Sequence, residues 1–158
     1  MGKLTPCLWF DTQADEAATF YTSVFKNSRI LETSYYGEAG PGTPGSVLTV
    51  SFELDGQQFT ALNGGPAHFG FSEAISFQVD CADQDEVDHF WERLGEAGEP
   101  GPCGWLKDKY GVSWQIVPRR MLELLQDPDP QRSARAVAAM MQMGKLDVAA
   151  LERAADGG

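Results

Sequence analysis

Residues able to bind a metal or exchange protons at neutral pH are few in this sequence, and they are widely spaced. His68 lies in a glycine-rich stretch, and His89 lies in a predicted helix beside an aspartate. The three cysteines have no CxxC spacing, which argues against a zinc knuckle or a disulfide framework. No pair of carboxylates stands out by its spacing, so the sequence names no residues for acid–base catalysis.

A polar pair inside an apolar strand is the most informative chemical feature. The stretch 108–118, DKYGVSWQIVP, predicts a tight turn followed by a strand. Because side chains alternate between the faces of a strand, Ser113 and Gln115 share one face and Trp114 lies on the other. We expect the bulky face to pack beneath a helix, which leaves the hydroxyl and the amide facing a cleft.

The same alternation, applied to three other predicted strands, extends this polar pair to a candidate pocket. Hydroxyls and amides among apolar walls suit an uncharged or weakly polar small molecule, aromatic ones included. Alternatively, the same side chains fill a closed core and hydrogen-bond to one another, and the pattern favours neither interpretation. The predicted ligand pocket is lined by Leu8, Phe10, Thr60, Leu62, Ser76, Gln78, Ser113 and Gln115.

The strands that carry these residues belong to two copies of one pattern. The segment 15–21, DEAATFY, is matched 70 positions later by 85–91, DEVDHFW. Strand and helix signals follow in the same order in both halves, except that the second half lacks a long Gly/Pro-rich loop. We therefore predict an α+β fold of two tandem βαβββ modules, residues 1–66 and 67–118, followed by a helical tail, 119–158.

Periodicity and turn residues place the elements of each module. Apolar residues at helical spacing mark one helix per module, and Asp11, Thr12 and Gln13 offer capping side chains for the first. A Gly/Pro-rich loop covers 37–45, and Asp55-Gly56 predicts a hairpin. The predicted strands are 4–10, 29–36, 46–54, 58–62, 73–79, 104–106 and 112–117, and the predicted helices are 14–25 and 83–98.

The tail has the pattern of three further helices, over 119–125, 133–143 and 148–155, with Asp147 as the cap of the last. Their apolar stripes need a surface to cover them. That surface is either the outer side of the same chain or a second subunit.

Charge and hydropathy limit the partners and the location. The net charge of -11, without a Lys/Arg cluster, argues against nucleic acid and anionic lipid as partners. No run approaches the roughly 18 apolar residues of a membrane span, and no apolar signal region follows the first residues. We expect a soluble, cytoplasmic protein.

Four stretches, TPCLWFDTQADEAATFYTSVF, FTALNGGP, EAISFQVD and GWLKDKYGVSWQIVP, resemble the PhnB-like branch of the vicinal-oxygen-chelate (glyoxalase/bleomycin resistance/dioxygenase) superfamily. This branch is often labelled demethylubiquinone methyltransferase. The resemblance covers residues 4–118 and extends into the tail at 143–153. It implies a pair of curved half-barrel sheets with helices on the convex side, a substrate cleft on the concave side, and a homodimer.

The resemblance also implies where a metal would bind. The four ligand positions of metal-dependent members fall on Pro6 or a neighbour, Thr60, Ala74 and Gln115. Proline and alanine offer no side-chain donor, and two neutral oxygens are too weak to hold a divalent metal. Glu73 is the best substitute ligand, but strand alternation places it on the opposite face from Ala74. We expect no metal and no other cofactor.

Two classes of function stay open. One is a non-catalytic protein that binds a small molecule, which the missing ligand set favours. The other is a lyase, isomerase or dioxygenase with a displaced metal or with acid–base chemistry from groups such as Glu73 and Glu53. The methyltransferase label lacks support, because the turn after the first strand, 10–13, has no glycine to cradle a methyl donor.

Overall fold

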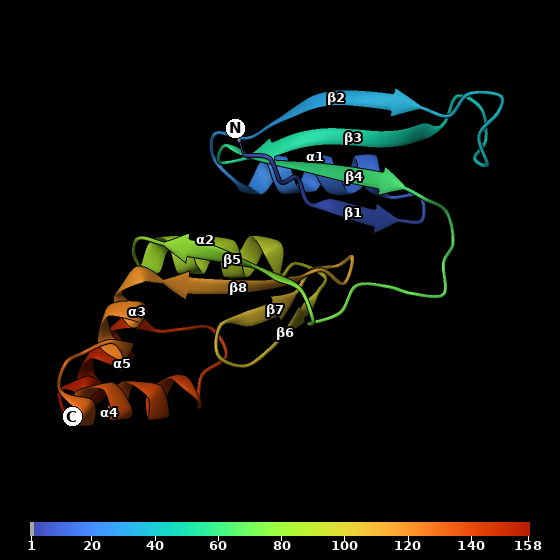
Figure 1. The fold of residues 1–158 in the computed structure, drawn as a ribbon. Helices are drawn as coiled ribbons and strands as arrows, with labels where there is room; N and C mark the ends of the chain where they lie inside the picture. The colour runs from blue at the N-terminus through green and yellow to red at the C-terminus, as the bar shows by residue number, and fades with distance from the viewer. Residues whose placement is uncertain (1) are drawn as a thin grey trace. The chain divides into compact units, whose positions relative to one another are not determined.

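The chain forms two compact units that repeat one topology. The computed structural model describes residues 2–158 and divides the chain at Gly70, so that the second unit spans Phe71–Gly158. Each unit holds a four-stranded mixed sheet with a helix on one face, as Figure 1 shows for α1 and α2. The predicted α+β fold with two βαβββ repeats is confirmed.

Unit 1 is built around one apolar face of its sheet. The strands are ordered β1-β4-β3-β2, with β1 parallel to β4 and the other neighbours antiparallel. On the face covered by the helix, Tyr21 stacks on Phe52, and Phe52 stacks on Phe59. The elements are β1 (Cys7–Phe10), α1 (Ala14–Val24), β2 (Arg29–Tyr35), β3 (Val47–Leu54) and β4 (Gln57–Asn63).

The cap of α1 comes from a distant strand. Asn63 Oδ1 accepts a hydrogen bond from the Ala14 N–H at 2.8 Å, and the Asn63 amide donates to the Val47 carbonyl at 3.2 Å. The prediction that the segment 11–13 supplies this cap is wrong, since the N-cap residue Gln13 makes no side-chain cap hydrogen bond. The buried Asn63 thus joins the end of β4 to the start of the helix.

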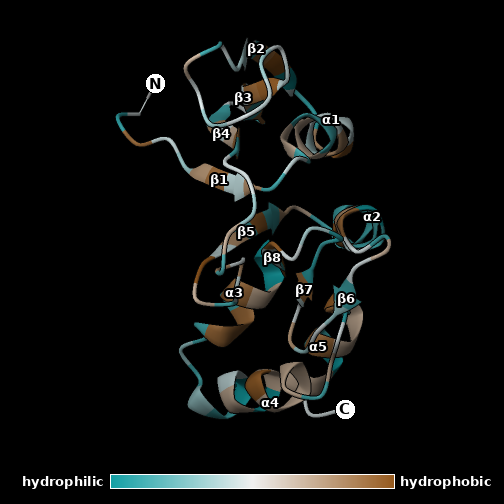
Figure 2. Ribbon diagram, turned by 90° about the vertical axis from the view of Figure 1, so that its right-hand side faces the viewer, coloured by the Kyte–Doolittle hydropathy of each residue, from teal (hydrophilic) through white to brown (hydrophobic). Residues whose placement is uncertain are grey.

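Unit 2 repeats this topology with the strand order β5-β8-β7-β6. Its helix has a reciprocal cap: Asp83 accepts from the Glu86 N–H, and Glu86 accepts from the Ala82 N–H. Figure 2 shows this helix as mostly hydrophilic. The elements are β5 (Ser76–Cys81), α2 (Gln84–Leu94), β6 (Glu99–Pro100), β7 (Trp105–Lys107) and β8 (Ser113–Pro118).

Several elements of unit 2 differ from the predicted ones. The strand predicted over 73–79 begins at Ser76, and the helix predicted to reach Gly98 ends at Leu94 with Gly95 as its C-cap. The two-residue strand β6 was not predicted, because it is too short for periodicity and contains a proline.

The hairpin between β7 and β8 turns around a buried carboxylate. Asp108 is 3% exposed and accepts hydrogen bonds from the backbone N–H groups of Tyr110 and Val112, and its other oxygen accepts from the Trp114 indole. Although residues 107–109 have the charged composition of a solvated hairpin tip, Asp108 is not solvated. The aspartate is a structural centre of the turn.

The C-terminal helices pack on unit 2 of their own chain. The backbone N–H groups of Cys103 and Gly104 donate to the carbonyls of Met143 and Gly144, at 2.7 and 2.8 Å. The apolar stripes are covered in part within the chain, since Ala136 and Leu151 are buried, whereas Val137 and Met141 stay exposed. The helices are α3 (Arg119–Leu125), α4 (Pro130–Met140) and α5 (Val148–Ala155), and their buried cluster comprises Val117, Met121, Leu124, Ala136, Leu146, Leu151 and Ala155.

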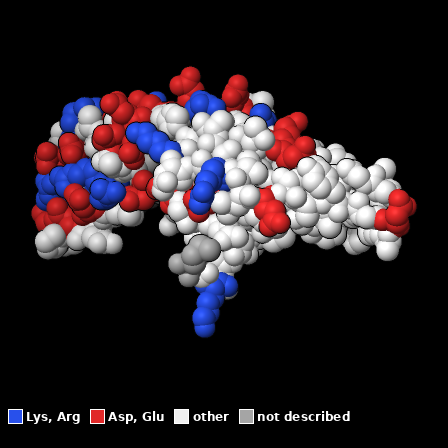
Figure 3. Space-filling view, turned by 90° about the horizontal axis from the view of Figure 1, so that it is seen from above, with Lys and Arg blue, Asp and Glu red and all other residues white. Residues whose placement is uncertain are grey.

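Charges on the surface are mixed in sign. On the face drawn in Figure 3, Lys and Arg lie beside Asp and Glu rather than in separate patches. Arg120, for example, pairs with both Glu123 and Glu152. In the described part of the chain, no helix combines the length and apolarity that crossing a bilayer requires.

Candidate functional site

Four of the predicted pocket residues share the open face of the unit 2 sheet. In the parallel pair β5–β8, Ser76 lies opposite Ser113, and Gln78 lies opposite Gln115. Trp114 is 3% exposed and lies on the other face, toward α2. The alternation predicted for this pair of strands therefore places the hydroxyls and amides together, away from the helix.

These side chains form a short hydrogen-bonded chain, here called the polar ladder (Ser76, Gln115 and Gln78). The Gln115 amide donates to Ser76 Oγ at 2.8 Å, and the Gln78 amide donates to Gln115 Oε1 at 3.4 Å. Ser76 and Gln115 are half-buried, whereas Gln78 is exposed. The ladder is uncharged and contains both donors and acceptors.

Ser113 is the exception on this face. Its side chain is 1% exposed, and its Oγ has no hydrogen-bond partner among the described residues. A buried hydroxyl without a partner costs about 1–3 kcal/mol, so natural proteins keep few of them. This hydroxyl needs an explanation, and a ligand or a water that reaches it would supply one.

A salt bridge spans the sheet near this serine. Lys107 of β7 lies directly opposite Ser113, on the same face, and its ammonium pairs with the Glu73 carboxylate just before β5. Because β8 lies between β5 and β7, this pair crosses the start of β8, where Ser113 lies. The hydrogen bond from Lys107 lowers the pKa of Glu73, and the same bond raises the pKa of Lys107.

On the sheet of unit 1, the predicted pocket residues do not share one face. The register pairs Leu8 with Ala61, on the buried face that α1 covers, and Phe10 lies on that face too, 3% exposed. Thr60 and Leu62 lie on the open face. The expectation that Leu8 and Phe10 line the pocket with them is therefore wrong.

On β1, the residues that share the open face with Thr60 and Leu62 are Cys7 and Trp9. Trp9 is 40% exposed. Its indole donates to the Gly65 carbonyl at 3.0 Å, and Phe69 meets it edge-on with ring centroids 5.3 Å apart. The pairing of Cys7 and Trp9 with β4 is a tertiary signal that the sequence does not contain.

The metal implied by the superfamily does not fit these residues. Pro6 and Ala74 both precede their strands, and Glu73, the substitute ligand, is held by Lys107. Only Thr60 and Gln115 remain, two neutral oxygens on separate sheets. Within residues 2–158, no group of three His, Cys, Asp or Glu side chains is arranged to hold a metal ion.

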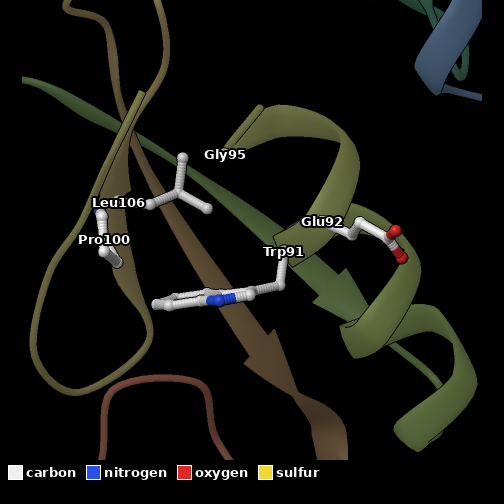
Figure 4. Close-up of a pocket in the computed structure, with 5 residues that line it drawn as sticks. All are labelled: Trp91, Glu92, Gly95, Pro100 and Leu106. Carbon is white, nitrogen blue, oxygen red and sulfur yellow. The ribbon is translucent and has the colours of Figure 1, made fainter. Parts of the chain in front are cut away.

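A separate groove of about 230 Å³ lies on the helix side of unit 2. Figure 4 shows Trp91 reaching from α2 toward Pro100 and Leu106, while the Glu92 carboxylate points away from them. None of the predicted pocket residues lines this groove. It is mostly apolar, and Glu92 is its one ionisable lining residue.

Residues 2–117 match the model of the family described as 3-demethylubiquinone-9 3-methyltransferase. A PhnB protein from Bacillus cereus, provisionally named a 3-demethylubiquinone-9 3-methyltransferase, is 38% identical; the match covers 74% of this chain and 99% of that one, with a TM-score of 0.67. The chain belongs to this family. Its PhnB-like members are part of the vicinal-oxygen-chelate superfamily, so the resemblance seen in the sequence is confirmed.

One more distant structure shares the fold of this PhnB-like chain, and a second is reported beside it. Protein PA1353 from Pseudomonas aeruginosa is 15% identical over 75% of this chain and 98% of that one, with a TM-score of 0.63. The fosfomycin resistance protein FosX from Listeria monocytogenes, solved with Mn(II) and sulfate, is 18% identical over 72% of this chain and 88% of that one, with a TM-score of 0.49. No curated protein matches the chain.

The methyl transfer in the family's description lacks support from the turn that follows the first strand. Methyl donors of the S-adenosylmethionine type bind at a glycine-rich turn after the first strand of a parallel sheet. In this chain both sheets are mixed, and the turn between β1 and α1, residues 11–13, contains no glycine. The residues present therefore do not fit a methyl donor.

Proposed function

We propose that this PhnB-like protein is a non-catalytic, metal-free binding protein for a small neutral molecule. The observation that carries the proposal is the polar ladder on the open face of unit 2. Gln115 of the ladder stands at one of the four positions where the family resemblance places a metal ligand, and it is hydrogen-bonded there to another amide and to a hydroxyl. Such groups orient a neutral ligand by hydrogen bonds and leave its chemistry unchanged.

The charge on this face supports a neutral ligand. Lys107 is the only cation among the open-face residues of β5, β7 and β8, and it is paired with Glu73. An anion would find no uncompensated positive charge, in a chain of net charge -11.

The alternative is an enzyme that uses a displaced metal or acid–base chemistry. Its best base is Glu73, but the salt bridge lowers the pKa of this carboxyl and weakens it as a proton acceptor near neutral pH. Methyl transfer lacks a donor site. The binding role is therefore the better supported of these functions.

Metal content and thermal shifts test the proposal. Protein purified without an affinity tag should contain far less than one equivalent of metal by elemental analysis. Its melting temperature should not rise with Ni²⁺, Zn²⁺, Fe²⁺ or Mn²⁺, but should rise with at least one compound of a neutral fragment library. A near-stoichiometric metal content, or a rise of several degrees in the melting temperature with one ion, would refute the metal-free binding role and favour the metal-dependent enzyme.

The family resemblance also favours a cytoplasmic homodimer as the working form. Sedimentation equilibrium, run with and without the library compound that binds, would measure the mass of the particle. A mass of one chain at tens of micromolar would contradict the dimer.

A further inference from the structure

The unused hydrogen-bonding groups of the polar ladder define what it can recognise. Gln78 uses one amide N–H to reach Gln115, which leaves its second N–H and its carbonyl oxygen without a partner in the described part of the chain. The two groups lie on one planar amide, and they present a donor beside an acceptor when the N–H bonded to Gln115 is the one that points away from the carbonyl oxygen. Ser76 accepts from Gln115 and keeps its own proton free to donate.

From this arrangement we infer that the ladder recognises a neutral ligand group with an N–H donor beside a carbonyl acceptor, as in a carboxamide or a lactam. The inference rests on the proposed binding function and names its ligand class. A pair of amides forms two parallel N–H to O=C hydrogen bonds, and the free edge of Gln78 is one half of such a pair.

Ions match this edge less well. A carboxylate has only acceptors, so one of its oxygens would face the Gln78 carbonyl oxygen. An amidinium has only donors, so it would face the Gln78 N–H. A ketone satisfies the N–H and leaves the carbonyl without a partner. Only a group that carries both functions satisfies both atoms of the Gln78 edge.

Ser113 provides the second, independent observation. Its hydroxyl is more than nine-tenths buried and lacks a partner, and it lies opposite Ser76 on the face of the ladder. A carbonyl oxygen of the ligand would give this hydroxyl an acceptor. To reach it, the ligand must displace the Glu73–Lys107 pair, both of whose side chains are partly exposed. Binding should therefore strengthen when this pair is removed.

Four probes of nearly one shape test the ligand class: benzamide, acetophenone, benzoate and benzamidine. Each is titrated into the full-length protein labelled with ¹⁵N, and the side-chain amide signals of Gln78 and Gln115 are followed. Benzamide should shift both signals and bind about tenfold more tightly than each other probe, the value of roughly one well-made hydrogen bond. Equal affinities for benzamide and acetophenone would overturn the inference.

Variants locate the site. Gln78→Leu and Ser113→Ala should each weaken benzamide binding about tenfold, while Lys107→Ala should strengthen it. Gln131→Leu, an exposed glutamine at the start of α4, is the matched control and should leave the affinity unchanged. Equal weakening by the control, or benzamide binding that none of these three variants alters, would refute the site at the ladder and Ser113. Amide spectra of each variant confirm its fold.

The two proposals fail separately. If neutral library compounds bind at the ladder but carboxamides have no advantage, the ligand class is wrong and the binding function stands. If neither a library compound nor any probe binds, the binding function fails, and the ligand class fails with it.

Discussion

Replacement of Ser113 by alanine should stabilise the protein, which is unusual for a change at a buried position. The serine hydroxyl is 1% exposed and has no partner among the described residues, so the folded state bears the cost of removing it from water. That cost is about 1–3 kcal/mol. Alanine has a weaker preference for strands, which offsets a few tenths of a kcal/mol. We expect a net gain of about 1 kcal/mol.

The serine across the strand pair is the matched control. Ser76 accepts a 2.8 Å hydrogen bond from Gln115, so Ser76→Ala removes a bond that is made and should lose about 0.5–1.5 kcal/mol. Urea unfolding at pH 7 measures both free energies. In a thermal scan, a gain of 1 kcal/mol corresponds to a rise of about 2–4 °C for a chain of this size.

The two serines must therefore change stability in opposite directions. A loss of 1 kcal/mol or more with Ser113→Ala would refute the reasoning, because it would mean that the hydroxyl has a partner in the folded protein. An ordered water is the first candidate for such a partner.

Three other predictions concern the rest of the fold. Asp108→Ala removes the acceptor of three hydrogen bonds in a buried turn. It should lower the free energy of unfolding in urea by about 3 kcal/mol or more and alter the Trp114 fluorescence. A decrease below about 1 kcal/mol would contradict the structural role of this turn. Burial raises the pKa of the Cys81 thiol to about 12. At pH 8 a disulfide reagent should therefore label the exposed Cys7 and spare Cys81 until the protein unfolds. Labelling of both thiols at one rate would show that Cys81 is accessible. A backbone hydrogen bond from Asp129 and a side-chain bond from Arg132 lower the pKa of Asp127. Its contribution to stability is therefore present above the unfolded-state pKa near 4, and it is lost as the pH falls through the folded-state pKa. Asp127→Asn should reduce the dependence of the unfolding free energy on pH below pH 4, and an unchanged dependence would contradict this.

The sequence by itself determined the repeat and most of the faces. Strict alternation along β8 and β4 separates Trp114 from Gln115 and Phe59 from Thr60, because a sheet with one covered face needs an apolar residue at every second position. The Asp55-Gly56 turn and the repeated helix motif define the order of the elements. These signals depend only on residues close together in the chain, so they can be recognised without a three-dimensional structure.

Only the tertiary structure decided the features that depend on a partner strand. The first strand is short and nearly all apolar, so periodicity could not tell whether Leu8 or Trp9 faces the helix, and a shift by one residue exchanges the faces. Asn63 caps a helix that begins 49 positions earlier, a contact that no local pattern encodes. Ser113 looks like any other serine of a strand in the sequence, and it becomes a buried hydroxyl without a partner only once β5 and β7 lie on either side of it.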